Sequence, residues 1–387
     1  MELDLDDIEK EVRKIRRDLH KIPETAFREN QTSDYIQSYL KKNQISFEKN
    51  IAKTGVIAEI MGSKQSNDEQ KIFILRADID GLPIAEETGL DFASDNGNMH
   101  ACGHDGHMAM LLVVSKLLKK NAKSFSGRIN MIFQPAEEEI GGAKKIINEK
   151  PDLFNKASFL FGFHIWNQIE TGKIAINNGT VFVSADTFNI EISGVGGHGA
   201  MPHKTVDPIF IASNLITSSQ SIISRKLKPG DLGVITFGKI DGGTAPNVIP
   251  ERVFLEGTIR AESSENREFL IENLKKMTQD ITKSLGGSSK FDITSGTGPV
   301  INNQNFSREV SQVAARVMGE ESVISIDPVS VGDDVSEFMK IVPSVYALLG
   351  AAKDGAAMHH NQKFDFDEEC LSLGVQLMLS LVDEKLN

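Results

Sequence analysis

The chain has 387 residues, of which 40% are hydrophobic, so it is long enough to form two domains. Its formal net charge of -12 argues against nucleic acid or an anionic membrane as a partner, because either would meet a surface of like sign. The two cysteines, Cys102 and Cys370, do not suggest a disulfide framework, and no basic leader or long apolar run is present, so we expect a soluble cytoplasmic protein that acts on a small molecule.

The first half of the chain alternates helical patterns with short apolar runs. Apolar residues at helical spacing predict an opening amphipathic helix that is capped by Asp6 or Asp7 and ends near Pro23. Three apolar runs predict buried strands: 72–75, 129–133 and 159–163. Polar residues follow each run, so the pattern predicts an α/β fold with a mixed, largely parallel sheet and a site beyond the carboxyl ends of its strands.

The residues from 184 to 296 follow a different pattern. A strand with alternating apolar residues precedes a helix, two strands, a second helix and a last strand. This βαββαβ order is the ferredoxin-like, split βαβ arrangement, and both flanks are rich in turn residues. We therefore expect a lid or dimerisation domain at 184–296, inserted into a catalytic metal-binding domain formed by 1–183 and 297–387.

The segment 99–107, MHACGHDGH, packs three histidines, one cysteine and one aspartate into nine residues. An apolar stretch follows it and predicts a buried helix, so this cluster lies at an element boundary, where functional groups concentrate. Cys102 and His104 alone are a weak signal for a metal site, and His107 can simply cap the helix. Further candidate ligands follow the predicted strands: Glu138, His164 and either His359 or His360. Together these residues supply the five or so ligands of a two-metal site.

Three carboxylates follow the strand at 129–133 in the segment 134–139, QPAEEE. The simplest interpretation is a solvated acidic turn at the start of a helix, where carboxylates gain from the helix dipole. Close to histidine ligands, adjacent carboxylates can instead divide two tasks, since one can bind metal while its neighbour takes a proton from metal-bound water.

With the motifs GGHGAMPH at 196–203, NVIP at 247–250 and HNQKF at 360–364, the chain resembles the aminoacylase, hippurate hydrolase and auxin-conjugate amidohydrolase family of dinuclear metallopeptidases. The similarity runs from Arg17 to Asp365, with the motifs in family order. It implies two divalent metal ions per subunit, zinc or manganese, for which cobalt or nickel can substitute in vitro. The metal ligands that the resemblance implies, one of them bridging, are Cys102, His104, Glu138, His164 and His360.

The resemblance also implies that Glu137 is the general acid/base. His360 is preferred to His359 because it lies four residues before Phe364, as in the family motif His-Asn-Pro-x-Phe. Gln362 replaces the proline of that motif, which leaves the loop conformation open and His359 as an alternative ligand.

In the inserted domain, the resemblance implies that His198 stabilises the oxyanion, often in the active site of a partner subunit. It implies that Asn247 and Arg260 hold the carboxylate of the amino-acid product, a task that suits the forked guanidinium of arginine. Asp78 and Asp80 are expected to support the site without binding metal directly. A homodimer or homotetramer is expected from the family.

We therefore predict a metal-dependent amidohydrolase that cleaves the amide bond of N-acyl amino acids, for example N-acetyl amino acids, into a carboxylate and a free amino acid. A dipeptidase or carboxypeptidase acting on small peptides would share every ligand and is the nearest alternative. A non-catalytic metal-binding module is a third hypothesis, but such a module has no use for Glu137. The sequence does not specify the acyl group, the amino acid or the metal.

Overall fold

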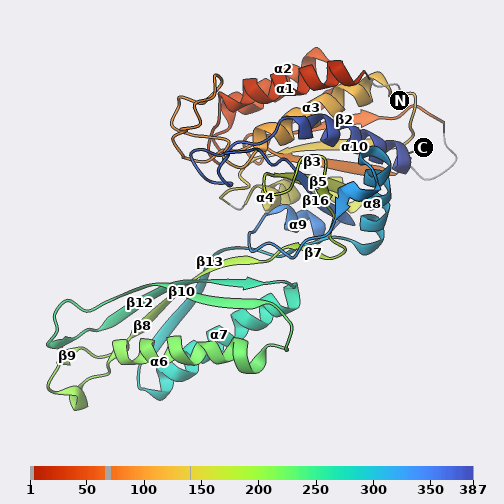
Figure 1. Cartoon of the computed structure of the whole chain (residues 1–387). Helices are drawn as coiled ribbons and strands as arrows, with labels where there is room; N and C mark the ends of the chain where they lie inside the picture. Colours follow the sequence, from red (N-terminus) through yellow and green to blue (C-terminus); the bar gives the residue numbers. More distant parts are fainter. Residues whose placement is uncertain (1–3, 66–70, 140, 387) are drawn as a thin grey trace. The chain divides into compact units, whose positions relative to one another are not determined.

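The computed structural model describes residues 4–65, 71–139 and 141–386 (Figure 1). Its contacts divide the chain into two compact units. The first unit comprises Met1–Val181, Ile301–Asp327 and Asp334–Asn387, and the second comprises Phe182–Val300 and Pro328–Asp333. The sequence-based domain boundaries at 184 and 296 stay a prediction.

The first unit is built on an eight-stranded sheet. Its strands are β1 Ser46–Ile51, β2 Gly55–Met61, β3 Ile72–Asp78, β4 Arg128–Gln134, β5 Phe159–Trp166, β6 Ile174–Ala175, β15 Val323–Ile324 and β16 Ser344–Gly350. They lie in the order β1-β2-β4-β3-β5-β16-β6-β15. The central strands β4, β3, β5 and β16 run parallel, whereas β1 and β2 add an antiparallel edge that the sequence analysis did not predict. A mixed α/β fold with a largely parallel central sheet is thus confirmed.

Helices cover both faces of this sheet. They are α1 Leu5–His20, α2 Asn30–Lys42, α3 His104–Lys120, α4 Gly142–Glu149, α5 Pro151–Asn155, α8 Gln304–Met318, α9 Val335–Met339 and α10 Glu369–Leu386. Helices α1, α3 and α10 pack on one face, and α4 and α9 lie on the other (Figure 1). The cap of α1 is Asp4, whose side chain accepts a hydrogen bond from the N–H of Asp7, so the predicted cap at Asp6 or Asp7 is wrong.

The second unit contains a four-stranded antiparallel sheet and two helices. Its elements are β8 Ala185–Ser193, β9 Gly197–His198, α6 Pro208–Ser221, β10 Gly233–Gly242, β11 Val248–Ile249, β12 Arg252–Ala261, α7 Ser264–Ser284 and β13 Ser288–Thr297. The strand order is β10-β12-β8-β13, and every second residue of β12 is buried. The buried face packs against α6 and α7 in a separate hydrophobic core.

Two short strands, β7 Thr180–Phe182 and β14 Val300–Ile301, pair near the ends of the second unit. Short helical turns lie at Pro202–Lys204, Ile222–Lys226 and Glu320–Ser322. Among the described residues, no helix is both long enough and apolar enough to cross a bilayer.

Candidate metal centre and active site

The five residues predicted to bind metal come together in the first unit, at the carboxyl end of its central strands. Cys102 lies in the turn before α3, and His104 is the first residue of that helix. Glu138 lies in the turn after β4, and His360 lies in the loop between β16 and α10. The sequence analysis placed His164 after the end of its strand. In the structure it lies within β5, because the strand continues to Trp166.

The ligand atoms form two groups of three that share the sulfur of Cys102. One group is Cys102, His104 and His164, and the other is Cys102, Glu138 and His360; within each, the atoms lie within 4.8 Å of one another. The Cys102 Sγ is 3.3 Å from His164 Nε2, and Glu138 Oε2 is 3.3 Å from His360 Nε2. Because zinc binds sulfur at about 2.3 Å and nitrogen at about 2.1 Å, such spacings are compatible with one cation in each group.

The ring nitrogens of His104 and His164 are arranged as metal binding requires. Nδ1 of His104 donates to the carbonyl oxygen of Asp80 at 2.9 Å, and Nδ1 of His164 donates to the carbonyl oxygen of Ile165 at 2.7 Å. Nε2 of each ring is therefore the nitrogen that can bind a cation. In the part of the chain that the structure describes, Nε2 of His104 is buried without a hydrogen-bond partner.

The charges at this centre favour a bound cation. Burial alone would lower the pKa of His104, but the carboxylates of Asp78, Asp80 and Glu138 raise it to about 10. Burial and nearby carboxylates also raise the pKa of the Cys102 thiol well above its usual value. A positive charge is therefore stabilised here, and a divalent cation could supply it, provided that it displaces the proton of the thiol.

Asp78 and His107 form a hydrogen-bonded pair behind the ligands. His107 Nδ1 lies 2.6 Å from Asp78 Oδ1, and His107 Nε2 accepts the N–H of Ile165 at 2.8 Å. The two ring nitrogens of His107 are thus both engaged, and the ring fixes the backbone next to His164. Despite its burial, Asp78 has a pKa well below the usual value, because His104 and other cationic groups stabilise its charge.

His359 and His360 face different surroundings. Nε2 of His359 donates to a backbone carbonyl of β5 at 2.9 Å, and the ring stacks on Trp166 with centroids 4.7 Å apart. Only His360 belongs to a ligand group among the described residues. Gln362, which stands where the family motif has proline, ties the loop to Glu87 through its side-chain amide and its backbone carbonyl. This geometry favours His360 as the ligand.

Glu137 lies beside the two ligand groups. It is 7% exposed, and its Oε2 is 4.0 Å from His104 Nε2. The third carboxylate of the run, Glu139, is exposed. A buried carboxylate next to a two-metal site can accept a proton from an attacking water and later release it to a leaving group.

Residues 74–384 match the family model described as peptidase family M20/M25/M40. This chain belongs to that family. The predicted resemblance and the predicted class of enzyme, a metal-dependent amidohydrolase or peptidase, are thus confirmed.

Three similar proteins show how far the likeness extends. An N-acetyl-L-cysteine deacetylase of Bacillus subtilis (strain 168) is 36% identical and aligns with 95% of this chain and 86% of its own length. Thermostable carboxypeptidase 1 of Saccharolobus solfataricus is 34% identical over 96% of this chain and 94% of its own length. The crystal structure of the Bacillus subtilis YXEP protein, a dinuclear metal-binding peptidase of family M20, has a TM-score of 0.85 at 31% identity and covers 98% of this chain and 99% of that one.

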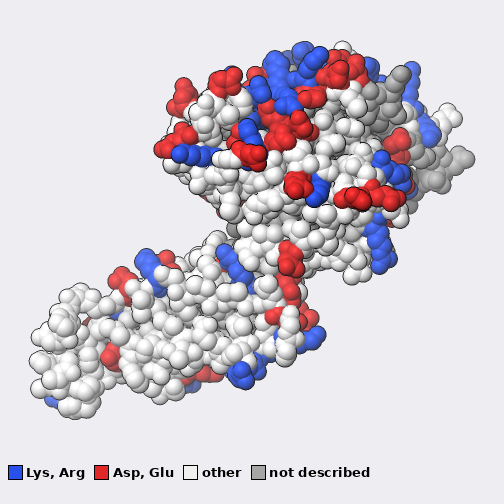
Figure 2. All heavy atoms as spheres, viewed as in Figure 1, with Lys and Arg blue, Asp and Glu red and all other residues white. Residues whose placement is uncertain are grey.

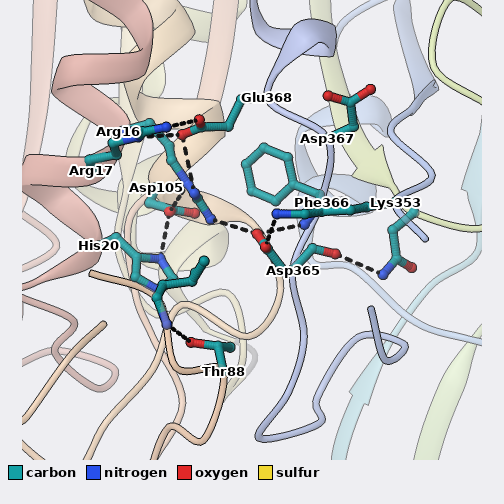
Figure 3. A network of polar contacts seen from close by, with 12 residues as sticks. Arg16, Arg17, His20, Thr88, Asp105, Lys353, Asp365, Phe366, Asp367 and Glu368 are labelled. Atoms are coloured by element: carbon teal, nitrogen blue, oxygen red, sulfur yellow. Dashed lines mark hydrogen bonds and ion pairs between the residues drawn. The ribbon is translucent and has the colours of Figure 1, made fainter. Parts of the chain in front are cut away.

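A buried charge network in the M20 chain anchors the start of α3 (Figure 3). Arg16 of α1 donates to Asp105 at 2.8 Å, and also reaches Asp365 and Glu368 before α10. His20 Nδ1 lies 2.7 Å from the same Asp105 carboxylate. Because Asp105 follows His104 directly, the network fixes the end of the helix that presents this ligand.

The candidate substrate residues lie in the second unit. His198 of β9 is exposed and pairs with Val248 of β11, so it lies next to Asn247, whose carbonyl oxygen accepts the N–H of Gly199. Arg260 is near the far end of β12, about 26 Å along the strand from Arg252 at its start. The structure therefore brings His198 and Asn247 together but does not bring Arg260 to them within one chain.

Sequence reasoning missed Glu29 and Asp334, which hold the loop of Glu137, and Thr54, which contacts Glu29. Glu29 accepts hydrogen bonds from Thr54 and from the N–H of Ala136. Asp334 accepts from the N–H groups of Gly141 and Ala143. None of the three belongs to a motif, so only contacts between distant parts of the chain reveal them.

Proposed function

We propose that this M20 chain hydrolyses the amide bond of N-acyl amino acids, such as N-acetyl amino acids, to a carboxylate and a free amino acid. The observation that carries the proposal is the pair of ligand groups that share Cys102 beside the buried carboxylate of Glu137. The similarity to an N-acetyl-L-cysteine deacetylase over 95% of the chain supports this choice of substrate.

In this proposal, Cys102, His104, Glu138, His164 and His360 would hold two divalent ions, zinc or manganese, and Cys102 is the residue common to both ligand groups. Bound dications would lower the pKa of water and polarise the substrate carbonyl. Glu137 takes a proton from the attacking water and delivers it to the departing amine. Nitrogen, sulfur and carboxylate ligands together suit zinc and also admit manganese.

We assign substrate recognition to the second unit, acting as a lid and dimerisation domain of a homodimer or homotetramer. His198 would stabilise the oxyanion, and Asn247 and Arg260 would bind the carboxylate of the amino acid. Since Arg260 lies far from Asn247 within one chain, a joint clamp requires two copies. The second unit also exposes large apolar side chains, among them Phe210, Ile240 and Phe254, and few charges on the face seen in Figure 2.

Mixed dimers test this assignment. Glu137→Gln and His198→Ala should each be inactive alone. When the two variants are unfolded and refolded together, activity should return, because one site of a mixed dimer combines an intact Glu137 with an intact His198 of the other copy. Activity that stays at the level of the separate variants would place His198 in its own subunit's site or outside catalysis.

A carboxypeptidase or dipeptidase remains the second candidate, because a carboxypeptidase of Saccharolobus solfataricus is almost equally similar. The two functions differ in whether the substrate carries a free amino group. We expect kcat/KM for N-acetyl amino acids to exceed that for unblocked dipeptides with the same C-terminal residue, as measured by amine release. A higher value for the dipeptides would assign the peptidase function instead.

The cellular compartment is also a proposal. Both cysteines, Cys102 and Cys370, are free and buried. A thiol that must bind metal is best preserved in a reducing environment. We therefore place the protein in the cytoplasm.

A further inference from the structure

Glu29 is a fully buried carboxylate to which the proposed chemistry gives no role. It directly precedes α2, but its side chain makes no capping hydrogen bond to that helix. Instead, Oε2 accepts the hydroxyl proton of Thr54 at 2.6 Å, and Oε1 accepts the N–H of Ala136 at 2.9 Å. The glutamate at this position is therefore explained by its hydrogen bonds to residues distant in the sequence, and not by capping of α2.

The residue that Glu29 holds has an unusual backbone. Ala136 is buried and has a φ of +54°, in the left-handed region that residues with a Cβ atom adopt at a cost in free energy. Without Glu29, its N–H would lose its partner in a region that excludes water. The hydrogen bond thus stabilises a conformation that Ala136 would not adopt by preference.

This conformation sets the position of Glu137. The N–H before Glu137, that of Ala136, donates to Glu29, and the N–H after it, that of Glu138, donates to Asp80 Oδ2 at 2.9 Å. The backbone of the proposed base is therefore held by a buried carboxylate on each side. The turn that carries Thr54 also packs closely on this loop, since a Cβ atom on Gly55 would lie 2.8 Å from the side chain of Pro135.

We propose that Glu29 is a positioning residue for Glu137, which it orients by holding Ala136 in the left-handed conformation. The inference rests on the proposed role of Glu137 as the base. Burial raises the pKa of Glu29 to about 7, so a neutral group of the same shape should also serve. What the loop requires is an acceptor for the Ala136 N–H.

The test compares two replacements of Glu29. Glu29→Met keeps the length of the side chain but removes the acceptor, and we expect kcat to fall about tenfold or more while KM and metal content stay unchanged. Glu29→Gln keeps an amide oxygen for Ala136 and turns its NH2 toward the Thr54 hydroxyl, which can accept, so kcat should stay within about threefold of the parent. A role in stability alone would not separate kcat from KM in this way.

A second substitution checks the route through Ala136. Glycine adopts positive φ without strain, so Ala136→Gly combined with Glu29→Met should recover about threefold or more of the lost kcat. The matched control is Glu24→Met, which removes the carboxylate that accepts from Thr32 at the start of α2; among the described residues, this carboxylate has no hydrogen bond to the loop of Glu137. It should lower the melting temperature and leave kcat unchanged.

The inference is overturned if Glu29→Met keeps kcat within about twofold of the parent, or if kcat is low in Glu29→Gln and is not raised by adding Ala136→Gly to Glu29→Met. If Glu29→Met does not fold, Thr54→Val, which removes the second partner of the carboxylate, should still lower kcat, and an unchanged kcat would overturn the inference. Glu137→Gln, measured in parallel, separates the two proposals. If Glu137→Gln retains turnover, the proposal that Glu137 is the base is rejected. If Glu137→Gln is inactive and Glu29→Met is fully active, only the role of Glu29 is rejected.

Discussion

Glu137 and Glu138 are neighbours in the sequence with different geometry in the structure. Glu138 lies 3.3 Å from His360 and belongs to a ligand group with Cys102. Glu137 stands beside His104, with 4.0 Å between its Oε2 and Nε2 of the ring, and belongs to neither group that contains Cys102. The carboxylates thus suit the two separate tasks that the sequence pattern had suggested.

Glu137→Gln should therefore abolish turnover and spare the metal centre. The amide keeps the size of the side chain but cannot take a proton, so we expect kcat to fall by about 100-fold or more. Metal content, measured by elemental analysis, should stay at the parent value. Turnover above about one per cent of the parent would contradict the assignment of this residue as the base.

Glu29 should leave a signature in the pH dependence of stability. Its folded-state pKa of about 7 lies above the unfolded value. Its contribution to the free energy of unfolding is therefore fully present below about pH 4.5 and is lost as the pH rises through about 7. Relative to Glu29→Gln, the parent should thus lose on the order of 3 kcal/mol of unfolding free energy between pH 4.5 and 8. Urea unfolding of both proteins at several pH values measures this difference, and parallel profiles would contradict it.

At the scale of elements, each ligand group draws on several segments of the chain. The first combines the start of α3 with β5, and the second combines the turn after β4 with the loop before α10. Cys102 in the turn before α3 belongs to both. Loss of one segment should therefore affect one cation, and loss of the shared thiol should affect both.

Substitution of ligands should separate these groups by stoichiometry. His360→Ala should reduce bound metal from two ions to about one per chain, whereas Cys102→Ala should weaken both sites. His359→Phe is the matched control, because it preserves the stacking on Trp166 and removes a side chain outside both groups. Elemental analysis after dialysis measures the content. A loss caused by His359→Phe but not by His360→Ala would exchange the roles of the two histidines.

The helix α1 shows which elements a sequence reveals and which details it hides. Its apolar residues at helical spacing predicted the helix correctly. Arg16 and His20 follow Val12 at intervals of four residues and lie on the same buried side of the helix. Charged or polar residues on an apolar helix face are a signal of a buried ionic network. The partners of Arg16 lie 89 to 352 residues away, so only the structure could identify them.

For the whole molecule, the sequence predicted the largely parallel sheet from its apolar runs. It also identified the candidate ligands, because these residues occur in short motifs. It did not predict the antiparallel strands β1 and β2 or the contact between Glu29 and Ala136, which lie 107 residues apart. A positive φ at Ala136 has no sequence signal, since the residue is not glycine. Motifs thus identified the groups proposed for chemistry but not the contacts that orient them.

The most direct test of the account is amine release from N-acetyl amino acids by metal-free protein titrated with zinc or manganese. We predict no turnover without metal and a rise to a plateau at about two ions per chain, with Glu137→Gln inactive at every metal concentration. Turnover that is unaffected by chelation, or the absence of turnover on every N-acyl amino acid at full metal occupancy, would contradict a two-metal amidohydrolase.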